Sequence, residues 1–174
     1  EEILFHSVFE DDKRLYEILA RLKSRLSMQL ASSGHATAAG RALSYFSPVN
    51  AFNDEISGIA FYQFVSGLEK NFDEKKEMLK EKLRLMMRRL FCREGLFVSL
   101  TSDEEGLKRM REPFLSFLGH LPEAADEVCD NALVLVKKNE GFMTPGQVQF
   151  VARAGNFKKD GYRYTGALRI LKVL

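Results

Sequence analysis

The sequence lacks the features that mark several common classes of protein. Its 174 residues include two cysteines, Cys92 and Cys129, which form neither a CxxC pair nor any metal-ligand spacing. We therefore expect two reduced thiols in an intracellular protein rather than a disulfide. No apolar run approaches the ~20 residues that a membrane-spanning helix needs, and no signal peptide is visible.

The sequence also lacks an excess of charge of either sign. It has 26 basic and 24 acidic residues, for a formal net charge of +2, and the two signs alternate along the expected helices. This balance gives no support for a nucleic acid or a membrane surface as a partner. With 45% hydrophobic residues, the composition is typical of a soluble globular protein with a buried core.

Histidine is scarce, and the familiar catalytic motifs are missing. The three histidines are His6, His35 and His120, and none has another within five residues. The HExxH and HxxEH motifs of zinc peptidases are therefore absent, as is the GxSxG motif of serine hydrolases. Because scattered histidines are usually structural or surface residues, we expect no catalytic residue and no metal ligand in this chain, and we assign no substrate-binding residue.

The segment SGHATAAGRALSYFSP, residues 33–48, is the most distinctive stretch of the chain. His35 beside Gly34 is either a ligand or general base at a flexible glycine, or an ordinary residue in the first turn of a helix. The second interpretation is favoured because no Cys, Asp or Glu lies within several residues to complete a site. Gly34 and Gly40 have the glycine spacing of a phosphate loop, but Arg41 and Ala42 replace its Lys and its Ser or Thr. The small residues favour a helix that packs closely on a neighbour.

Apolar residues at helical spacing predict a helical first half of the chain. Asp11 and Asp12 supply a cap and favourable charge to the first helix, and Asn71 with Glu74 resembles a capping box for the fourth. Four helices are expected, at residues 15–30, 36–47, 54–68 and 71–91.

The expected helix at 71–91 has an apolar side and a charged side. Lys80 is expected on the solvent side with its charged neighbours. Met86 and Met87 have the spacing of core residues, which favours a buried stripe over a flexible recognition surface. The expected buried residues are Leu79, Leu83, Met86, Met87 and Leu90.

The second half of the chain mixes the period of helices with that of strands. Ser102 with Glu105 resembles a capping box for a helix to about Leu118, which Pro113 kinks or divides, and Thr165 begins a last helix. Alternation predicts strands at residues 96–101, 132–138 and 147–154. The order indicates an α+β fold, in which a helix-rich N-terminal part is followed by an antiparallel-type sheet covered by helices.

The segment NFKKDGYRY, residues 156–164, gathers basic and aromatic side chains. Its alternatives are contact with a nucleic acid or an acidic peptide through Lys158, Lys159 and Arg163, or a solvated turn at Asp160-Gly161. The turn is favoured because no fold-level nucleic-acid-binding motif accompanies the basic residues.

Four segments in series resemble one family of enzymes. They are SGHATAAGRALSYFSP, SGIAFYQFVSGLEKNFDEKKEMLKEKL, LFVSLTSDEEG and MTPGQVQFVARAGNFKKDGYRYTGALRILKVL. Together they are similar to the C-terminal half of the pitrilysin or insulinase-type zinc metallopeptidases (peptidase family M16), in the presequence protease branch, which is subfamily C. The two ends, EEILFHSVF and YTGALRILKVL, are already apolar and lead us to expect a fragment of a longer polypeptide.

The resemblance implies a zinc-dependent endopeptidase of unstructured peptides, built from two halves that close around the substrate. The HxxEH zinc site lies in the N-terminal half of such enzymes, so the zinc ligands would lie outside this chain. This chain would be inactive alone and would form part of the wall around the substrate. Residues 1–93 would be the later part of the third peptidase-like domain, 94–130 a strand, helix and connection, and 131–174 the opening of the fourth domain.

The resemblance also implies partners and a location. The partners would be the catalytic N-terminal half of the same polypeptide and a peptide substrate, with neither a nucleic acid nor a membrane. The location would be the bacterial cytoplasm, or the mitochondrial matrix in a eukaryote. The alternative function is a non-enzymatic helical interaction module that docks through residues 71–91.

Overall fold

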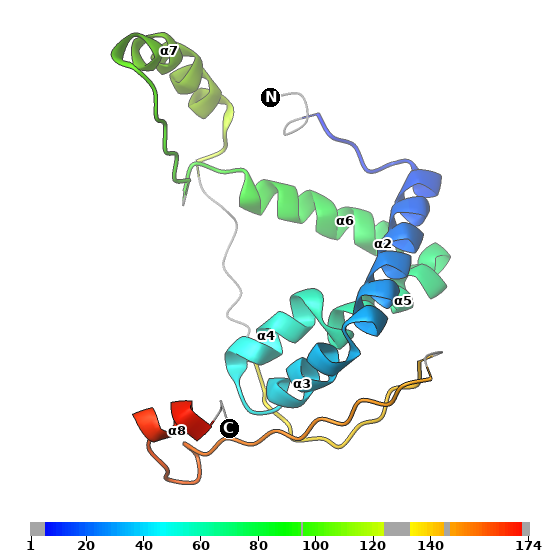
Figure 1. The fold of residues 1–174 in the computed structure, drawn as a ribbon. Helices are drawn as coiled ribbons and strands as arrows, with labels where there is room; N and C mark the ends of the chain where they lie inside the picture. Colours follow the sequence, from blue (N-terminus) through cyan, green and yellow to red (C-terminus); the bar gives the residue numbers. More distant parts are fainter. Residues whose placement is uncertain (1–5, 95, 124–132, 145–146, 172–174) are drawn as a thin grey trace. The chain divides into compact units, whose positions relative to one another are not determined.

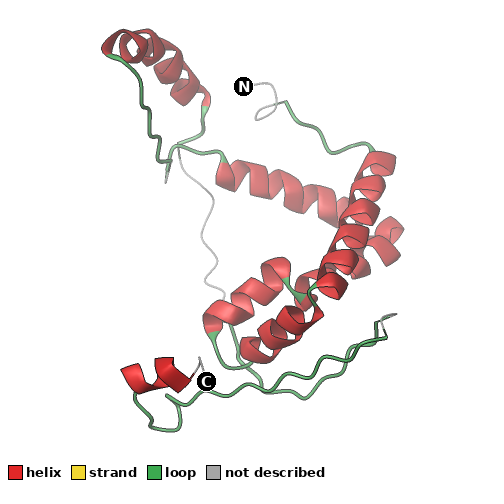
Figure 2. Cartoon of the chain, in the orientation of Figure 1, coloured by secondary structure: helices red, strands yellow, loops and turns green. Residues whose placement is uncertain are grey.

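A computed structural model describes residues 6–94, 96–123, 133–144 and 147–171. Within these residues the chain has helices and no β-strand (Figure 1, Figure 2). In the described part of the chain, no helix combines the length and the apolar composition needed to cross a membrane. The helices are α2 (Asp12–Ser32), α3 (Gly34–Ser44), α4 (Pro48–Ser57), α5 (Ile59–Lys70), α6 (Phe72–Leu90), α7 (Glu104–His120) and α8 (Gly166–Leu171).

The chain divides into two compact units. The first unit comprises Glu1–Ile18 and Asn71–Asn131, and the second comprises Leu19–Lys70 and Ala132–Leu174. In the second unit α3 packs on α4 and α4 packs on α5. The core of this unit includes Ile59, Val65 and Leu68, all from α5.

The predicted α+β fold with an antiparallel-type sheet is wrong. Residues 96–101, 133–138 and 147–154, expected as strands, run as loops instead (Figure 2), and residue 132 lies outside the described residues. Alternation indicates an extended backbone, whereas a strand also needs a neighbouring backbone with which to exchange hydrogen bonds. No backbone hydrogen bond joins one of these segments to another in the part that the structure describes.

The helix expected at residues 54–68 is two helices, because the extended backbone of Gly58 separates α4 from α5. The Asp54 carbonyl oxygen accepts a hydrogen bond from the Gly58 backbone N–H at 3.0 Å, and its carboxylate oxygen Oδ1 accepts one from the Ile59 backbone N–H at 2.9 Å. The carbonyl bond is the last intrahelical bond of α4, whereas the carboxylate of Asp54 caps the first turn of α5. Pro48, expected as a stop, instead opens α4, where the missing proline N–H breaks no intrahelical bond.

The helix expected at 71–91 is confirmed as α6, but its buried side differs from the prediction. Met86 and Leu90 are 54% and 65% exposed, whereas Lys80 is only 5% exposed. The Lys80 ammonium lies 2.6 Å from the Asp12 carboxylate and 2.9 Å from that of Glu77. A buried ammonium needs such partners, and the partner at residue 12 is invisible to the helical period of α6. The predicted cap is also wrong, since the Asn71 side chain makes no cap hydrogen bond.

The remaining helices agree more closely with the sequence. Asp11 caps α2 by accepting a hydrogen bond from the Arg14 backbone N–H at 2.9 Å. The cap of α7 is one residue later than predicted, because Asp103 accepts from the Gly106 backbone N–H at 2.8 Å. Pro113 lies inside α7 without dividing it.

Candidate functional site

Five side chains of the second unit contact one another around one guanidinium, here called the Arg41 cluster: Arg41, Tyr45, Asp54, Glu140 and Phe142. The Arg41 guanidinium donates to both carboxylate oxygens of Glu140, from Nε at 2.9 Å and from Nη2 at 3.2 Å. It also donates to Asp54 through Nη1, and the Tyr45 hydroxyl donates to Glu140. One arginine therefore joins α3, α4 and the extended segment 133–144.

The Arg41 cluster is shielded from solvent at its centre. The Arg41 and Asp54 side chains are 16% and 6% exposed. The guanidinium carbon lies 5.3 Å from the centroid of the Tyr45 ring and 5.8 Å from that of the Phe142 ring, which is the range of cation–π attraction. The cluster thus combines a bidentate ion pair with two aromatic contacts on the same cation.

The contacts within the cluster favour the charged forms of Arg41 and Glu140 and the neutral form of Tyr45. Burial acts to lower the Arg41 pKa, but the hydrogen bonds with Glu140 and Asp54 outweigh it and raise that pKa. The hydrogen bond from Arg41 holds the Glu140 pKa below its ordinary value, against the opposing effect of burial. Burial, followed by the hydrogen bond to Glu140, raises the pKa of the Tyr45 hydroxyl. Arg41 and Glu140 therefore both stay charged at neutral pH. Their ion pair holds the segments together and does not act as a proton donor or acceptor.

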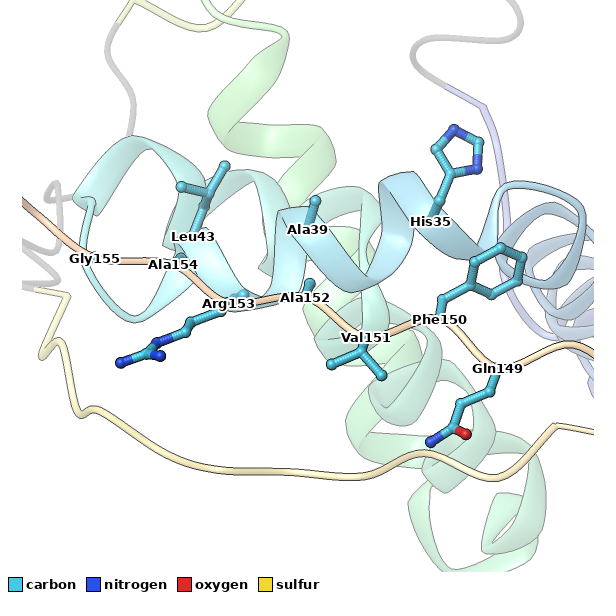
Figure 3. Close-up of a pocket in the computed structure, with 11 residues that line it drawn as sticks. His35, Ala39, Leu43, Gln149, Phe150, Val151, Ala152, Arg153, Ala154 and Gly155 are labelled. Carbon is cyan, nitrogen blue, oxygen red and sulfur yellow. The ribbon is translucent and has the colours of Figure 1, made fainter. Parts of the chain in front are cut away.

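An open groove of about 670 Å³ lies between α3 and residues 149–155 of the same unit. In Figure 3, Phe150 and Ala152 point toward α3, whereas Val151 points away. The His35 ring centroid lies 6.1 Å from that of Phe150, and a Cβ on Gly34 would come within 2.5 Å of the Phe150 ring. The small residues of α3 therefore allow a close approach, as the sequence predicts.

His35 and the two nearby glycines take the ordinary helical role. Gly34 begins α3 and Gly40 lies within it, so no loop is available to cradle a phosphate. No group of three or more His, Cys, Asp or Glu side chains in the described ranges could hold a metal ion. His6 and His120 belong to the first unit and His35 to the second. The described residues do not fit a zinc site, and we derive no zinc chemistry from them.

The basic segment near the C-terminus contains the predicted turn. Gly161 has a φ of +86°, a conformation that glycine adopts without strain. The Asn156 side-chain oxygen accepts from the backbone N–H groups of Lys158 and Lys159, at 3.1 Å and 3.3 Å. Its amide nitrogen donates to the Phe46 carbonyl at 3.2 Å, so the turn is fastened to the chain just after α3.

Of the two cysteines, Cys92 lies within the described residues. Cys92 is a free, buried thiol, and its Sγ lies 3.3 Å from the Glu94 carbonyl oxygen as a weak hydrogen bond. Cys129 lies outside the described residues.

Sequence reasoning missed the Arg41 cluster. Arg41 drew attention only as the residue that spoils a phosphate-loop pattern, and its partner Glu140 lies 99 residues further along the chain. No periodicity or spacing rule links residues so far apart, and one sequence offers no covariation to reveal the pair.

Comparison with known proteins gives these features a family context. Residues 1–68 match the family described as associated with the M16 peptidases of subfamily C. The whole chain is 31% identical over 174 residues to Protein HypA of Clostridium perfringens, of which it covers 18%. It is 29% identical over 166 residues, or 94% of this chain, to Presequence protease 1, chloroplastic/mitochondrial, of Arabidopsis thaliana, of which it covers 15%.

The chain therefore spans less than a fifth of the length of either relative. The resemblance expected from the four segments is confirmed, since the second relative carries the presequence protease name and the family match carries the name of the same peptidase subfamily. The similarity extends beyond the matched family region, because both alignments continue past residue 68. Over residues 1–68 the chain is therefore similar to the family associated with the M16 peptidases of subfamily C, and over most of its length it is similar to one segment of each of these two longer relatives.

Proposed function

We propose that this chain is a non-catalytic segment of a zinc-dependent metalloendopeptidase that degrades unstructured peptides. It forms part of the half of the enzyme that encloses the substrate. The observation that carries the proposal is the similarity of 94% of the chain to a presequence protease. The zinc ligands lie elsewhere in the polypeptide, because neither HExxH nor HxxEH occurs in these residues.

The Arg41 cluster supports a wall-forming role better than a chemical one. Its ions are engaged with each other, so they hold the extended segment 133–144 against α3 and α4. A wall around an unstructured peptide must keep its shape, and an ion pair shielded from solvent fixes geometry in this way.

The direct test compares two parts of the enzyme. The isolated 174-residue chain should bind no stoichiometric zinc and cleave no unstructured peptide. The full-length protein from which these residues are deleted should retain zinc but lose degradation of long peptides. Tight zinc binding by the isolated chain, with cleavage that a chelator abolishes, would overturn the proposal.

The partners and location follow from the same proposal. The segment contacts the catalytic half of its own polypeptide and the peptide substrate. The protein works in the bacterial cytoplasm, or in the mitochondrial matrix of a eukaryote. Fractionation of the source cells tests the location, and recovery of the protein with the membrane or outside the cell contradicts it.

The rival function is a helical interaction module that docks through α6. The observation that favours it is the exposure of Met86 and Leu90 on that helix. The sequence that flanks these residues in the gene discriminates the two functions. An upstream HxxEH motif supports the peptidase, whereas a short reading frame around this chain supports the module.

A further inference from the structure

Helix α7 is amphipathic, yet none of its residues is buried in the described structure. Leu107, Met110 and Phe114 follow one another at intervals of three and four residues, so they lie on one side of the helix, here called the α7 face. Leu107 and Met110 are 44% and 47% exposed. Lys108 and Arg109 lie on the opposite side, with side chains 74% exposed, so the helix has the pattern of one that packs against an apolar surface.

The polar contacts of α7 secure its ends without covering the α7 face. Asp103 caps the N-terminus through the Gly106 backbone N–H. At the other end, the Arg93 side chain donates to the carbonyls of Leu118 at 2.6 Å and Gly119 at 3.1 Å. Such contacts satisfy groups that every helix end leaves open, and they contribute about 1 kcal/mol each.

α7 has little apolar burial, because Phe114, Phe117 and Leu118 are only half-buried and none of its side chains is fully buried. Most of the stability of a helix in a protein comes from packing of its apolar face, and the 17 residues of α7 include Pro113, which removes one intrahelical hydrogen bond. The exposed pairs Lys108–Glu104 and Arg109–Glu105 contribute only ~0.3–0.5 kcal/mol each. A helix with this sequence therefore needs a cover over its apolar side chains.

The size of the α7 face decides what kind of cover it fits. A helix of 17 residues is about 25 Å long and about 10 Å wide, so one side offers on the order of 250 Å². A stable interface between separate proteins buries ~800 Å² on each partner. The α7 face alone is too small to hold a second copy of the chain, whereas a segment of the same polypeptide packs without losing translational freedom.

The lengths of the two relatives indicate what could cover the α7 face. The chain covers 18% and 15% of the two matched proteins, which leaves most of such a polypeptide to provide the cover. We infer that the α7 face is buried against another part of the same, longer polypeptide. This inference rests on the proposed function, because it takes the chain to be a segment of a longer peptidase.

The test measures thiol accessibility on both sides of α7 in the full-length protein. Leu107→Cys places a thiol on the α7 face, and Lys108→Cys is the matched control on the solvent side. In the full-length protein, Leu107→Cys should react with a maleimide about tenfold more slowly than Lys108→Cys, since reaction then requires local opening. In the 174-residue chain the two rates should agree within about twofold, and wild-type protein gives the background of the native cysteines.

A second readout requires no substitution. Peroxide oxidation of Met110, followed by mass spectrometry, should be slower in the full-length wild-type protein than in the 174-residue chain. Met143, which is fully exposed and lies far from α7 in sequence, reports whether general reactivity differs between the two samples.

Three results would overturn the inference. Equal accessibility of the α7 face in the two proteins would show that the rest of the polypeptide does not cover it. Protection in the 174-residue chain that grows with its concentration would identify a second copy as the cover. Protection that appears in the full-length protein only after peptide is added would identify the substrate.

Zinc-dependent cleavage, measured on the same full-length samples, separates this inference from the proposed function. Cleavage without protection of the α7 face means that the inference alone fails. Protection without zinc-dependent cleavage means that the proposed function alone fails.

Discussion

Helices α5 and α7 carry apolar side chains at helical spacing, but they differ in what covers those side chains. The 12 residues of α5 include three that are buried, Ile59, Val65 and Leu68, and α5 packs on α4. The 17 residues of α7 include none. The longer of the two helices is therefore the one with no fully buried side chain.

The comparison also separates two kinds of stabilisation. α7 has a side-chain cap and two exposed ion pairs with i,i+4 spacing, which define where the helix begins and favour the helical state locally. α5 has its residues in a core, and apolar burial contributes about 1.5–3 kcal/mol for each fully buried large side chain. Polar contacts position α7, whereas burial stabilises α5.

The largest difference between α5 and α7 should appear when a leucine side chain is removed from each helix. Leu68 is 5% exposed, and Leu107 on the α7 face is 44% exposed. Leu68→Ala should lower the free energy of unfolding by about 3 kcal/mol, because it leaves a cavity, while Leu107→Ala should lower it by about 0.5 kcal/mol or less. Urea titration followed by far-ultraviolet circular dichroism measures both, and equal losses would mean that α7 already has a cover in this chain.

The Arg41 cluster should produce the next largest effect. Arg41→Met removes the only cation of the cluster and leaves the Asp54 and Glu140 carboxylates without the guanidinium that both of them accept from. Because the Arg41 side chain is 16% exposed, we expect the free energy of unfolding to fall by about 2 kcal/mol. This is less than the ~3–5 kcal/mol lost when a fully buried pair is broken.

Arg109→Met on α7 is the matched control for Arg41→Met. Arg109 also pairs with a glutamate, but its side chain is 74% exposed, so its loss should cost ~0.5 kcal/mol or less. If the two variants unfold at the same urea concentration, the Arg41 cluster is no more than a surface ion pair.

A smaller effect separates the two glycines of α3. A Cβ on Gly40 meets no heavy atom within 4 Å, whereas a Cβ on Gly34 comes within 2.5 Å of the Phe150 ring. Gly40→Ala should stabilise the chain by about 0.5–1 kcal/mol through helix propensity. Gly34→Ala should not be stabilised in this way, because the Phe150 ring must move to make room for the Cβ. Thermal unfolding of the two variants measures the difference in stability. A stabilising Gly34→Ala would argue against the close approach of residues 149–155 to α3.

The sequence predicted local features of this chain well and long-range ones poorly. The first helix, the turn at Gly161 and the close packing around Gly34 follow from propensity, capping and side-chain size, which act over a few residues. The sheet was wrong because alternation at 147–154 reports backbone extension and says nothing about a partner. Glu140 and Lys80 escaped prediction because their partners, Arg41 and Asp12, lie far away in the sequence.

The smallest expected effect is a pH dependence that belongs to the Arg41 cluster. The Glu140 pKa lies below its ordinary value of 4.5, chiefly because Arg41 donates hydrogen bonds to the carboxylate. A depressed pKa stabilises the folded state fully above the ordinary value, and this stabilisation is lost as the pH falls through the folded-state pKa. Glu140→Gln should therefore be less stable than wild type at pH 7, and the difference should shrink as the pH falls below 4.5.

The control for this pH dependence is Glu105→Gln on α7, which removes an exposed carboxylate 3.7 Å from Arg109. Its stability should follow that of the wild type closely at each pH, because an exposed pair contributes little in either state. Urea titrations at several pH values between about 3 and 7 compare the three proteins. A Glu140→Gln difference that stays constant across this range would mean that Arg41 does not hold the Glu140 carboxylate in its charged form, and the cluster would then lose its role as the tie between α3 and residues 133–144.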